Sequence, residues 1–113
     1  MEPFHEELLT YPPAIKNAEK NLLEITASVE DMYAIEKNYI LTINAQISSN
    51  LAFKNELQRK TELDRLLKEN IDYCTAKTNA AQAAYQRETL RIDLEYLKNM
   101  FRAYLAIVGG QQR

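Results

Sequence analysis

The chain has 113 residues, with 46% hydrophobic and 27% charged residues and a net charge of −2 at neutral pH. Its two glycines are adjacent at positions 109–110 and its three prolines lie within residues 3–13, so residues 14–108 contain neither type. This pattern excludes glycine-rich phosphate loops and nucleotide-binding fingerprints, as well as a β-fold built on several tight turns. The composition therefore predicts an all-α protein with one domain.

The charges and the single cysteine bound the class of protein further. No apolar run approaches the roughly 18 residues of a membrane span, and the first residues lack the basic and apolar regions of a signal peptide. Cys74 has no second cysteine for an internal disulfide, so we expect a cytoplasmic protein without membrane contact. Residues 1–53 carry three basic and eight acidic side chains, whereas residues 54–113 carry eleven and eight. Either the two halves lie against each other, or the second half presents a basic surface.

The first predicted helix covers about residues 12–48, after an N-terminal segment of residues 1–11. Prolines at 12–13 suit a first helical turn, where the missing N–H is not needed. Beyond them, seam positions recur with alternating three- and four-residue spacing, as in a coiled coil. They are Ile15, Ala18, Leu22, Ile25, Val29, Met32, Glu36, Tyr39 and Ile43.

Two further helices are predicted, at about 51–69 and 72–108, with Asp72 as the N-cap of the last one. The middle helix is short, and its apolar face consists of leucines. The last helix keeps the three-four spacing over its whole length. Its seam positions are Tyr73, Ala76, Ala80, Ala83, Arg87, Leu90, Leu94, Leu97, Phe101, Tyr104 and Val108. The glycines at 109–110 are expected to end this helix and to begin a flexible tail of residues 109–113.

The two long heptad patterns predict a long antiparallel helical hairpin, coiled-coil-like, with the short third helix packed at the turn end. One register places Ala18 opposite Phe101 and Ile43 opposite Ala76, so that large side chains meet small ones. The turn end would then be three helices thick.

This register puts Glu36 and Arg87 into the seam in adjacent layers. A structural charge pair that fixes register and orientation is the favoured interpretation. The alternative, a buried catalytic carboxylate, lacks a second acid or a nucleophile at a supporting spacing.

The other end of the hairpin would be only two helices thick and would have little core. Phe4, Leu8 and Leu9 could fold over it, or it could pack against another copy. Four apolar residues lie off the seam and are candidates for an oligomer contact: Leu23, Ile92, Tyr96 and Leu105. A homo-oligomer is therefore favoured over a monomer.

The sequence offers no catalytic constellation, no metal site and no cofactor site. His5 and Cys74 are far apart, and no calcium-binding loop is present. A thiol at a helix start could be activated by the helix dipole, but no histidine is near Cys74 in sequence. We therefore expect a protein that is not an enzyme.

A basic cluster on the middle helix is the candidate ligand site. It comprises Lys54, Arg59, Lys60, Arg65 and Lys68. Acidic residues lie among these cations, so a solvated helix of mixed charge is the favoured interpretation. Phosphate contact by a basic tip is the alternative.

The stretch over residues 55–63, Asn-Glu-Leu-Gln-Arg-Lys-Thr-Glu-Leu, resembles a segment of small all-helical phage and prophage proteins of unknown function. The resemblance extends over about residues 55–102 and includes a leucine pair, an asparagine break before a tyrosine, and a terminal helix with leucine and phenylalanine. The resemblance implies an accessory role in phage DNA recombination, and it assigns no site residue. We therefore expect a non-enzymatic helical interaction or adaptor protein that binds a protein partner, itself, or both. The alternatives are a nucleic-acid-binding accessory that uses the basic helix, and a virion assembly protein.

Overall fold

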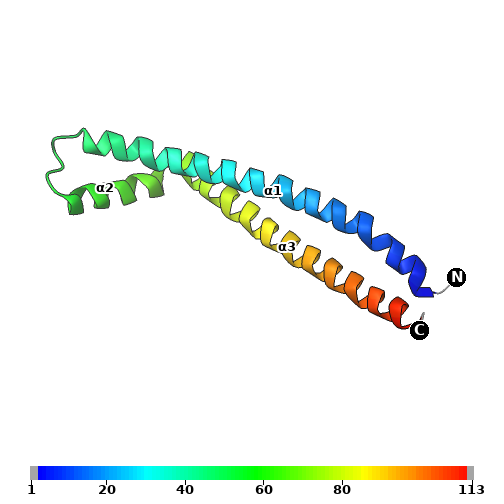
Figure 1. The fold of residues 1–113 in the computed structure, drawn as a ribbon. Helices are drawn as coiled ribbons and strands as arrows, with labels where there is room; N and C mark the ends of the chain where they lie inside the picture. The colour runs from blue at the N-terminus through cyan, green and yellow to red at the C-terminus, as the bar shows by residue number, and fades with distance from the viewer. Residues whose placement is uncertain (1–2, 112–113) are drawn as a thin grey trace. The chain divides into compact units, whose positions relative to one another are not determined.

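A computed structural model describes the backbone of residues 3–111 and the side chains of residues 5–110. The protein is an all-α helical hairpin, as predicted, and the described residues contain no strand. Helix α1 spans Pro3–Ser48, α2 spans Glu56–Glu69 and α3 spans Ile71–Gln111 (Figure 1). The ends of the predicted N-terminal segment and tail, residues 1–2 and 112–113, lie outside the described residues.

The contacts group the chain into two compact units. Unit 1 pairs the start of α1 with the end of α3 and comprises Met1–Ala27 and Tyr85–Arg113. Unit 2 comprises Ser28–Ala84 and contains the rest of both long helices together with α2.

The predicted seam is confirmed by burial in each unit. The seam residues of both helices are all buried or half-buried, and Val29 and Ala80 are fully enclosed. Because this pattern follows from heptad spacing alone, the pairing faces of the two helices are encoded locally.

In unit 1, helix α1 begins at Pro3, so the predicted start at residue 12 is wrong. Pro12 and Pro13 lie inside the helix and remove the N–H groups that would bond the carbonyls of Leu8 and Leu9. Tertiary packing offsets this loss, because the Tyr11 ring lies against both aromatic side chains near the end of α3.

The ring centroids of Tyr11 and Phe101 are 6.2 Å apart, and those of Tyr11 and Tyr104 are 5.5 Å apart. The predicted register gave the place opposite Phe101 to Ala18, seven residues after Tyr11. It is therefore wrong by one heptad. The early helix start explains the error, because two added turns of α1 make the aromatic contact available.

The end of α3 also differs from the prediction. Gly109 and Gly110 remain in the helix, which ends at Gln111, and neither glycine has a positive φ. The glycine cap expected at this point does not form, and residues 109–111 of the predicted tail are helical.

In unit 2, α2 begins at Glu56 and not at residue 51. Asn55 is the N-cap, and its side-chain oxygen accepts a hydrogen bond from the Gln58 backbone N–H at 2.8 Å. The Gln58 side chain in turn accepts from the Lys54 N–H at 2.9 Å. This reciprocal arrangement is a variant of the capping box, and it fixes the start of the helix.

Asn70 alone joins α2 to α3. Its N–H donates to the carbonyl oxygen of Leu66 at 3.0 Å, and its side-chain oxygen accepts from the Tyr73 N–H at 2.9 Å. Asn70 therefore ends one helix and caps the next, which corrects the predicted role of Asp72.

Helix α2 lies along the last turns of α1 and leads through Asn70 into the start of α3 (Figure 1). The three-helix layer predicted at the turn end is therefore absent from the described residues, and α2 contains no buried residue.

Candidate functional site

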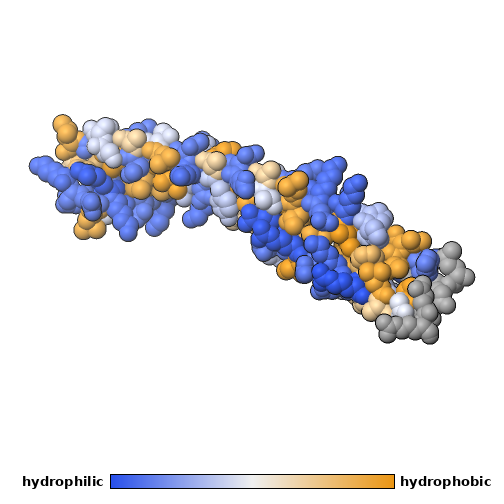
Figure 2. Space-filling model, viewed as in Figure 1, coloured by the Kyte–Doolittle hydropathy of each residue, from blue (hydrophilic) through white to orange (hydrophobic). Residues whose placement is uncertain are grey.

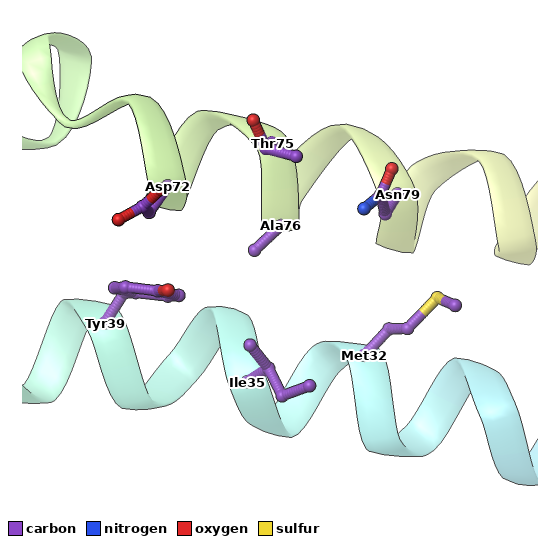
Figure 3. Close-up of a pocket in the computed structure, with 7 residues that line it drawn as sticks. All are labelled: Met32, Ile35, Tyr39, Asp72, Thr75, Ala76 and Asn79. Carbon is purple, nitrogen blue, oxygen red and sulfur yellow. The ribbon is translucent and has the colours of Figure 1, made fainter.

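A shallow groove runs along one side of unit 2, where α1 faces the start of α3. One hollow of about 340 Å³ is lined by Met32, Ile35 and Tyr39 of α1 and by residues of the first two turns of α3 (Figure 3). A second hollow of about 460 Å³ shares Ile35 and Tyr39 and continues along α1 to Gln46, and Asn70, between α2 and α3, also lines it. Because the two hollows share these side chains, they form one continuous groove.

The groove exists because small side chains of α3 oppose large ones of α1. Figure 3 shows Ala76 pointing toward Ile35, while Tyr39 lies across from Asp72. A methyl group at position 76 leaves the Ile35 side chain uncovered, and 51% of that residue is exposed. The helical break at Asn70, between α2 and α3, also lies beside the groove.

The pairing of α1 with α3 in unit 2 also differs from the predicted register. Ala76 was predicted to face Ile43, but it faces Ile35, about two turns earlier in α1 (Figure 3). The same shift is seen at the aromatic contact in unit 1.

The groove can bind by apolar contact and by hydrogen bonds, but its side chains supply no nucleophile–base pair. Its α3 side is polar and presents Asp72, Thr75 and Asn79 opposite the apolar residues of α1. Histidine, cysteine and acidic side chains form no metal-binding group among the described residues. The arrangement resembles the lining of a recognition groove, apolar with a few polar groups at the edge.

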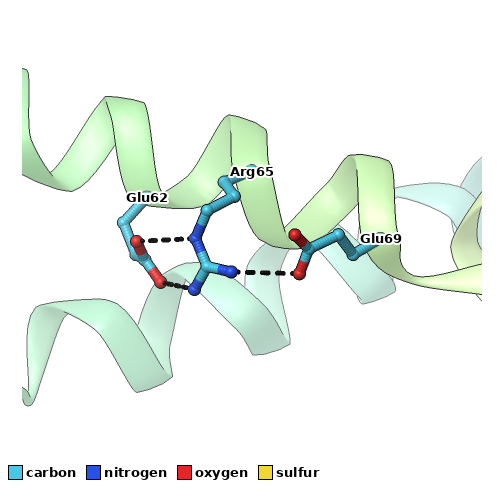
Figure 4. A network of polar contacts seen from close by, with 3 residues as sticks. All are labelled: Glu62, Arg65 and Glu69. Atoms are coloured by element: carbon cyan, nitrogen blue, oxygen red, sulfur yellow. Dashed lines mark hydrogen bonds and ion pairs between the residues drawn. The ribbon is translucent and has the colours of Figure 1, made fainter.

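The basic cluster on α2 does not form a continuous cationic face. At about 100° per residue, the four helical members point to different sides of the helix. Arg65 is held by two acids: its Nε lies 3.1 Å from Glu62 and its Nη1 lies 3.0 Å from Glu69 (Figure 4). The hydrogen bond from Arg65 lowers the pKa of Glu62, and Glu62 together with Glu69 raises the pKa of Arg65. Lys54, Arg59, Lys60 and Lys68 are exposed.

The residues predicted as a seam charge pair have different surroundings. Glu36 is half-buried in unit 2, and Arg87 is half-buried in unit 1. The Arg87 Nε is buried without a hydrogen-bond partner and lies 3.8 Å from the carboxylate of Glu88. The predicted pairing depended on the register that the structure corrects, and the ion pair that Arg87 makes is with Glu88.

The ion pairs among the described residues all lie within α2 or within α3. The described residues therefore show no ion pair between the acidic first half and the basic second half. His5 is half-buried, and Cys74 is exposed, with its Sγ 3.4 Å from the carbonyl oxygen of Leu67.

The four candidates for an oligomer contact are all exposed, and they lie in unit 1: Leu23, Ile92, Tyr96 and Leu105. Apolar residues interrupt the hydrophilic surface on the face shown in Figure 2. Leu9 is 62% exposed, so it does not cover the end of the hairpin that is only two helices thick. The side chain of Phe4 is not among the described side chains.

The groove was not predicted from the sequence, because its lining residues come from two helices and the predicted register between these helices was wrong. The small seam residues of α3, Ala76 and Ala80, were the available signal. Shifting the pairing by one heptad would have placed large α1 side chains over small α3 side chains without filling the space between them.

Comparison with models of protein families, with curated proteins and with solved structures finds no match. No helix in the described part of the chain is long and apolar enough to cross a membrane.

Proposed function

We propose that this protein is a non-enzymatic interaction protein whose unit 2 groove binds an amphipathic helix of a protein partner. The observation that carries the proposal is the exposed apolar side chain of Ile35, next to half-buried Tyr39 and beside the small side chain of Ala76. A helix can place an apolar side chain into such a groove every third or fourth residue, and polar groups at the edge can set its orientation.

The groove dimensions support a helix as the occupant. The two hollows follow α1 from Met32 to Gln46, a rise of about 21 Å at 1.5 Å per residue, which accommodates about four turns of a partner helix. The side chains of Asp72 and Asn79 at the α3 edge would favour a partner with hydrogen-bond donors beside its apolar stripe.

The experiment is affinity capture from the native host with variants that fill the groove. Ala76→Leu places a larger side chain over Ile35 and should abolish capture of the partner. Ala34→Leu is the matched control, because Ala34 is exposed on α1 and does not line the groove. Equal capture by both variants, with unchanged circular dichroism, would refute the groove as the binding surface.

Binding of nucleic acid by the basic cluster is the second candidate, favoured only by the exposed cations Lys54, Arg59, Lys60 and Lys68. Their spread around the helix and the engagement of Arg65 make it the weaker proposal. A gel-shift titration with single-stranded and duplex DNA at low salt tests it, because phosphate contacts are strongest there. No shift at low salt excludes this candidate.

The cellular setting is also a proposal. Free, exposed Cys74 fits a reducing cytoplasm. An accessory role in a phage or prophage rests on the resemblance over residues 55–102, and sequencing of the neighbouring genes in the host would test it.

A further inference from the structure

The tip, residues 50–60, comprises most of the loop between α1 and α2 and the start of α2, at one end of unit 2 (Figure 1). The Phe53 N–H donates to the Asn50 carbonyl oxygen at 3.3 Å, and the Ala52 N–H donates to the Asn50 side-chain oxygen at 3.0 Å. These two bonds close a β-turn, which places Leu51 and Ala52 at its corner.

The corner of this turn is apolar and exposed. Leu51 is 92% exposed, Ala52 is also exposed, and Leu57 at the start of α2 is 74% exposed. A shallow hollow lined in part by Ala52, Phe53 and Leu57 makes the apolar surface continuous from the loop to the helix. Polar residues and glycine dominate turns, so an apolar corner held out by hydrogen bonds is unusual, and a continuous apolar patch is a candidate contact surface.

The charges around the tip indicate the kind of surface that it meets. Residues 38–61, which contain the tip and its flanks, carry three basic side chains and one acidic one. The rest of unit 2, residues 28–37 and 62–84, carries four basic and seven acidic side chains. The tip end of unit 2 therefore has a net charge of +2 against −3 for the remainder. The cations of the tip are Lys54, Arg59 and Lys60, and its one acid is Glu56.

The three cations are available to an external anion. No ion pair joins Lys54, Arg59 or Lys60 to another described residue, whereas Arg65, further along α2, is held by two acids. Arg59 and Lys60 lie about 4.5 and 6 Å along the axis from Glu56, and helical side chains lean toward the N-terminus of their helix. Their charged groups therefore extend toward the level of the loop. Glu56 lies in the first turn, where it complements the helix dipole.

We propose that the tip docks on a membrane surface that contains anionic lipids, with Leu51 inserted below the headgroups and the three cations at the lipid phosphates. A projecting apolar turn fits a fluid interface, which adjusts its shape around an inserted side chain, and the flanking cations fit an anionic leaflet. Nucleic acid would engage the cations but would offer no apolar medium to Leu51. Docking on a surface needs no spanning segment, so the expectation of no membrane contact does not follow from the lack of a long apolar run.

The proposed contact combines two contributions, as reversible membrane binding commonly requires. Each cation near an anionic leaflet contributes roughly fivefold in affinity, and insertion of a leucine contributes roughly tenfold or more. Loss of either contribution should therefore be measurable by itself. The proposal does not rest on the groove, because no residue of the tip lines it, so loss of membrane docking and loss of partner capture are separate outcomes.

Co-sedimentation of the full chain with vesicles measures the docking. Wild type should bind vesicles of phosphatidylcholine with phosphatidylserine, should not bind phosphatidylcholine alone, and should bind more weakly as salt is raised. Leu51→Ser should lower the affinity about tenfold. Leu23→Ser is the matched control, because it changes a 73% exposed leucine in unit 1, and it should leave binding unchanged.

A second pair of variants tests the electrostatic contribution. Lys60→Gln should lower the affinity for phosphatidylserine vesicles about fivefold, and Lys77→Gln, which removes an exposed cation of α3, should not. No binding of wild type to these vesicles, or equal losses within either pair of variants, would overturn the proposal. Binding of DNA without binding of vesicles would assign the cations to nucleic acid and overturn it as well.

Insertion of the turn has its own readout, because the chain contains no tryptophan. Leu51→Trp introduces a single indole whose emission should shift to shorter wavelength when phosphatidylserine vesicles are added. Leu23→Trp is the control, and its emission should stay unchanged. Vesicle-bound Leu51→Trp without such a shift would contradict insertion of the tip.

Discussion

Replacing Tyr11 with alanine tests both the early start of α1 and the corrected register. The Tyr11 ring makes two aromatic contacts, with centroid separations of 6.2 Å to Phe101 and 5.5 Å to Tyr104. Aromatic pairs at such distances contribute about 0.5–1.5 kcal/mol each beyond burial, and truncation of a fully buried aromatic costs about 3–5 kcal/mol. Because Tyr11 is half-buried, we expect Tyr11→Ala to lower the free energy of unfolding by about 2–3 kcal/mol.

Thermal unfolding followed by circular dichroism measures this loss, which corresponds to a decrease in Tm of roughly 10 °C. Tyr11→Phe is the control, since it keeps the ring and should be nearly neutral. A double-mutant cycle between Tyr11 and Phe101 should give a coupling free energy of about 1 kcal/mol. A neutral Tyr11→Ala variant, or an absent coupling, would refute the corrected register and the docking of the first turns of α1.

The titration of the Tyr11 hydroxyl gives an independent readout. Burial raises the pKa of Tyr11 above its ordinary value of 10.0, with smaller contributions from Tyr104, Glu7 and Tyr96. The folded state thus favours the neutral phenol, so this contribution to stability is complete below pH 10 and is lost as pH rises through the folded pKa. A spectroscopic pH titration of the wild type and of Tyr11→Phe gives the ionisation of Tyr11 as the difference between the two curves. This difference should appear above pH 10.0, and a difference centred at the ordinary tyrosine pKa would contradict the burial of Tyr11.

Three other predictions follow from the helix ends and the α2 network. Asn70→Ala should lower the free energy of unfolding by about 1 kcal/mol in chemical denaturation, because it removes the cap of α3, whereas Asn70→Gly should cost only a few tenths; equal losses would contradict the cap. Pro12→Ala should raise Tm, because it restores an N–H to the interior of α1; a lower Tm would show that Pro12 is needed for the packing of this turn. Arg65 lowers the pKa of Glu62 from its ordinary value of 4.5, so this stabilisation is present above pH 4.5 and is lost as pH falls through the folded pKa. The Tm difference between wild type and Glu62→Gln should therefore shrink on acidification, and a difference independent of pH would exclude the interaction.

The faces of the helices could be predicted from the sequence, because heptad spacing is a local property. Every predicted seam position from Tyr73 to Val108 is buried or half-buried. The register could not be predicted in the same way, because it depends on where α1 begins. Two prolines at 12–13 are a strong local signal for a helix start, and the contact of Tyr11 with the end of α3 overrides it.

The breaks between helices lie near the predicted positions, but the first one is longer than predicted and the cap of α3 is Asn70 and not Asp72. Asn55 and Gln58 form a capping arrangement that is readable in the sequence, three residues apart, and it explains why α2 begins five residues later than predicted. The groove is harder to find in the sequence, because it arises from small side chains on one helix only after the partner helix has been placed.

Site-specific photo-crosslinking in the native host tests most directly whether the unit 2 groove is the binding surface. A photoreactive residue at Ile35, inside the groove, should form a covalent adduct with one partner protein, and Ala76→Leu in the same chain should abolish it. The same photoreactive residue at Lys37, which is exposed on α1 but does not line the groove, should form no such adduct. Identical adducts from both positions, or adducts at Ile35 that persist with Ala76→Leu, would contradict the proposed function.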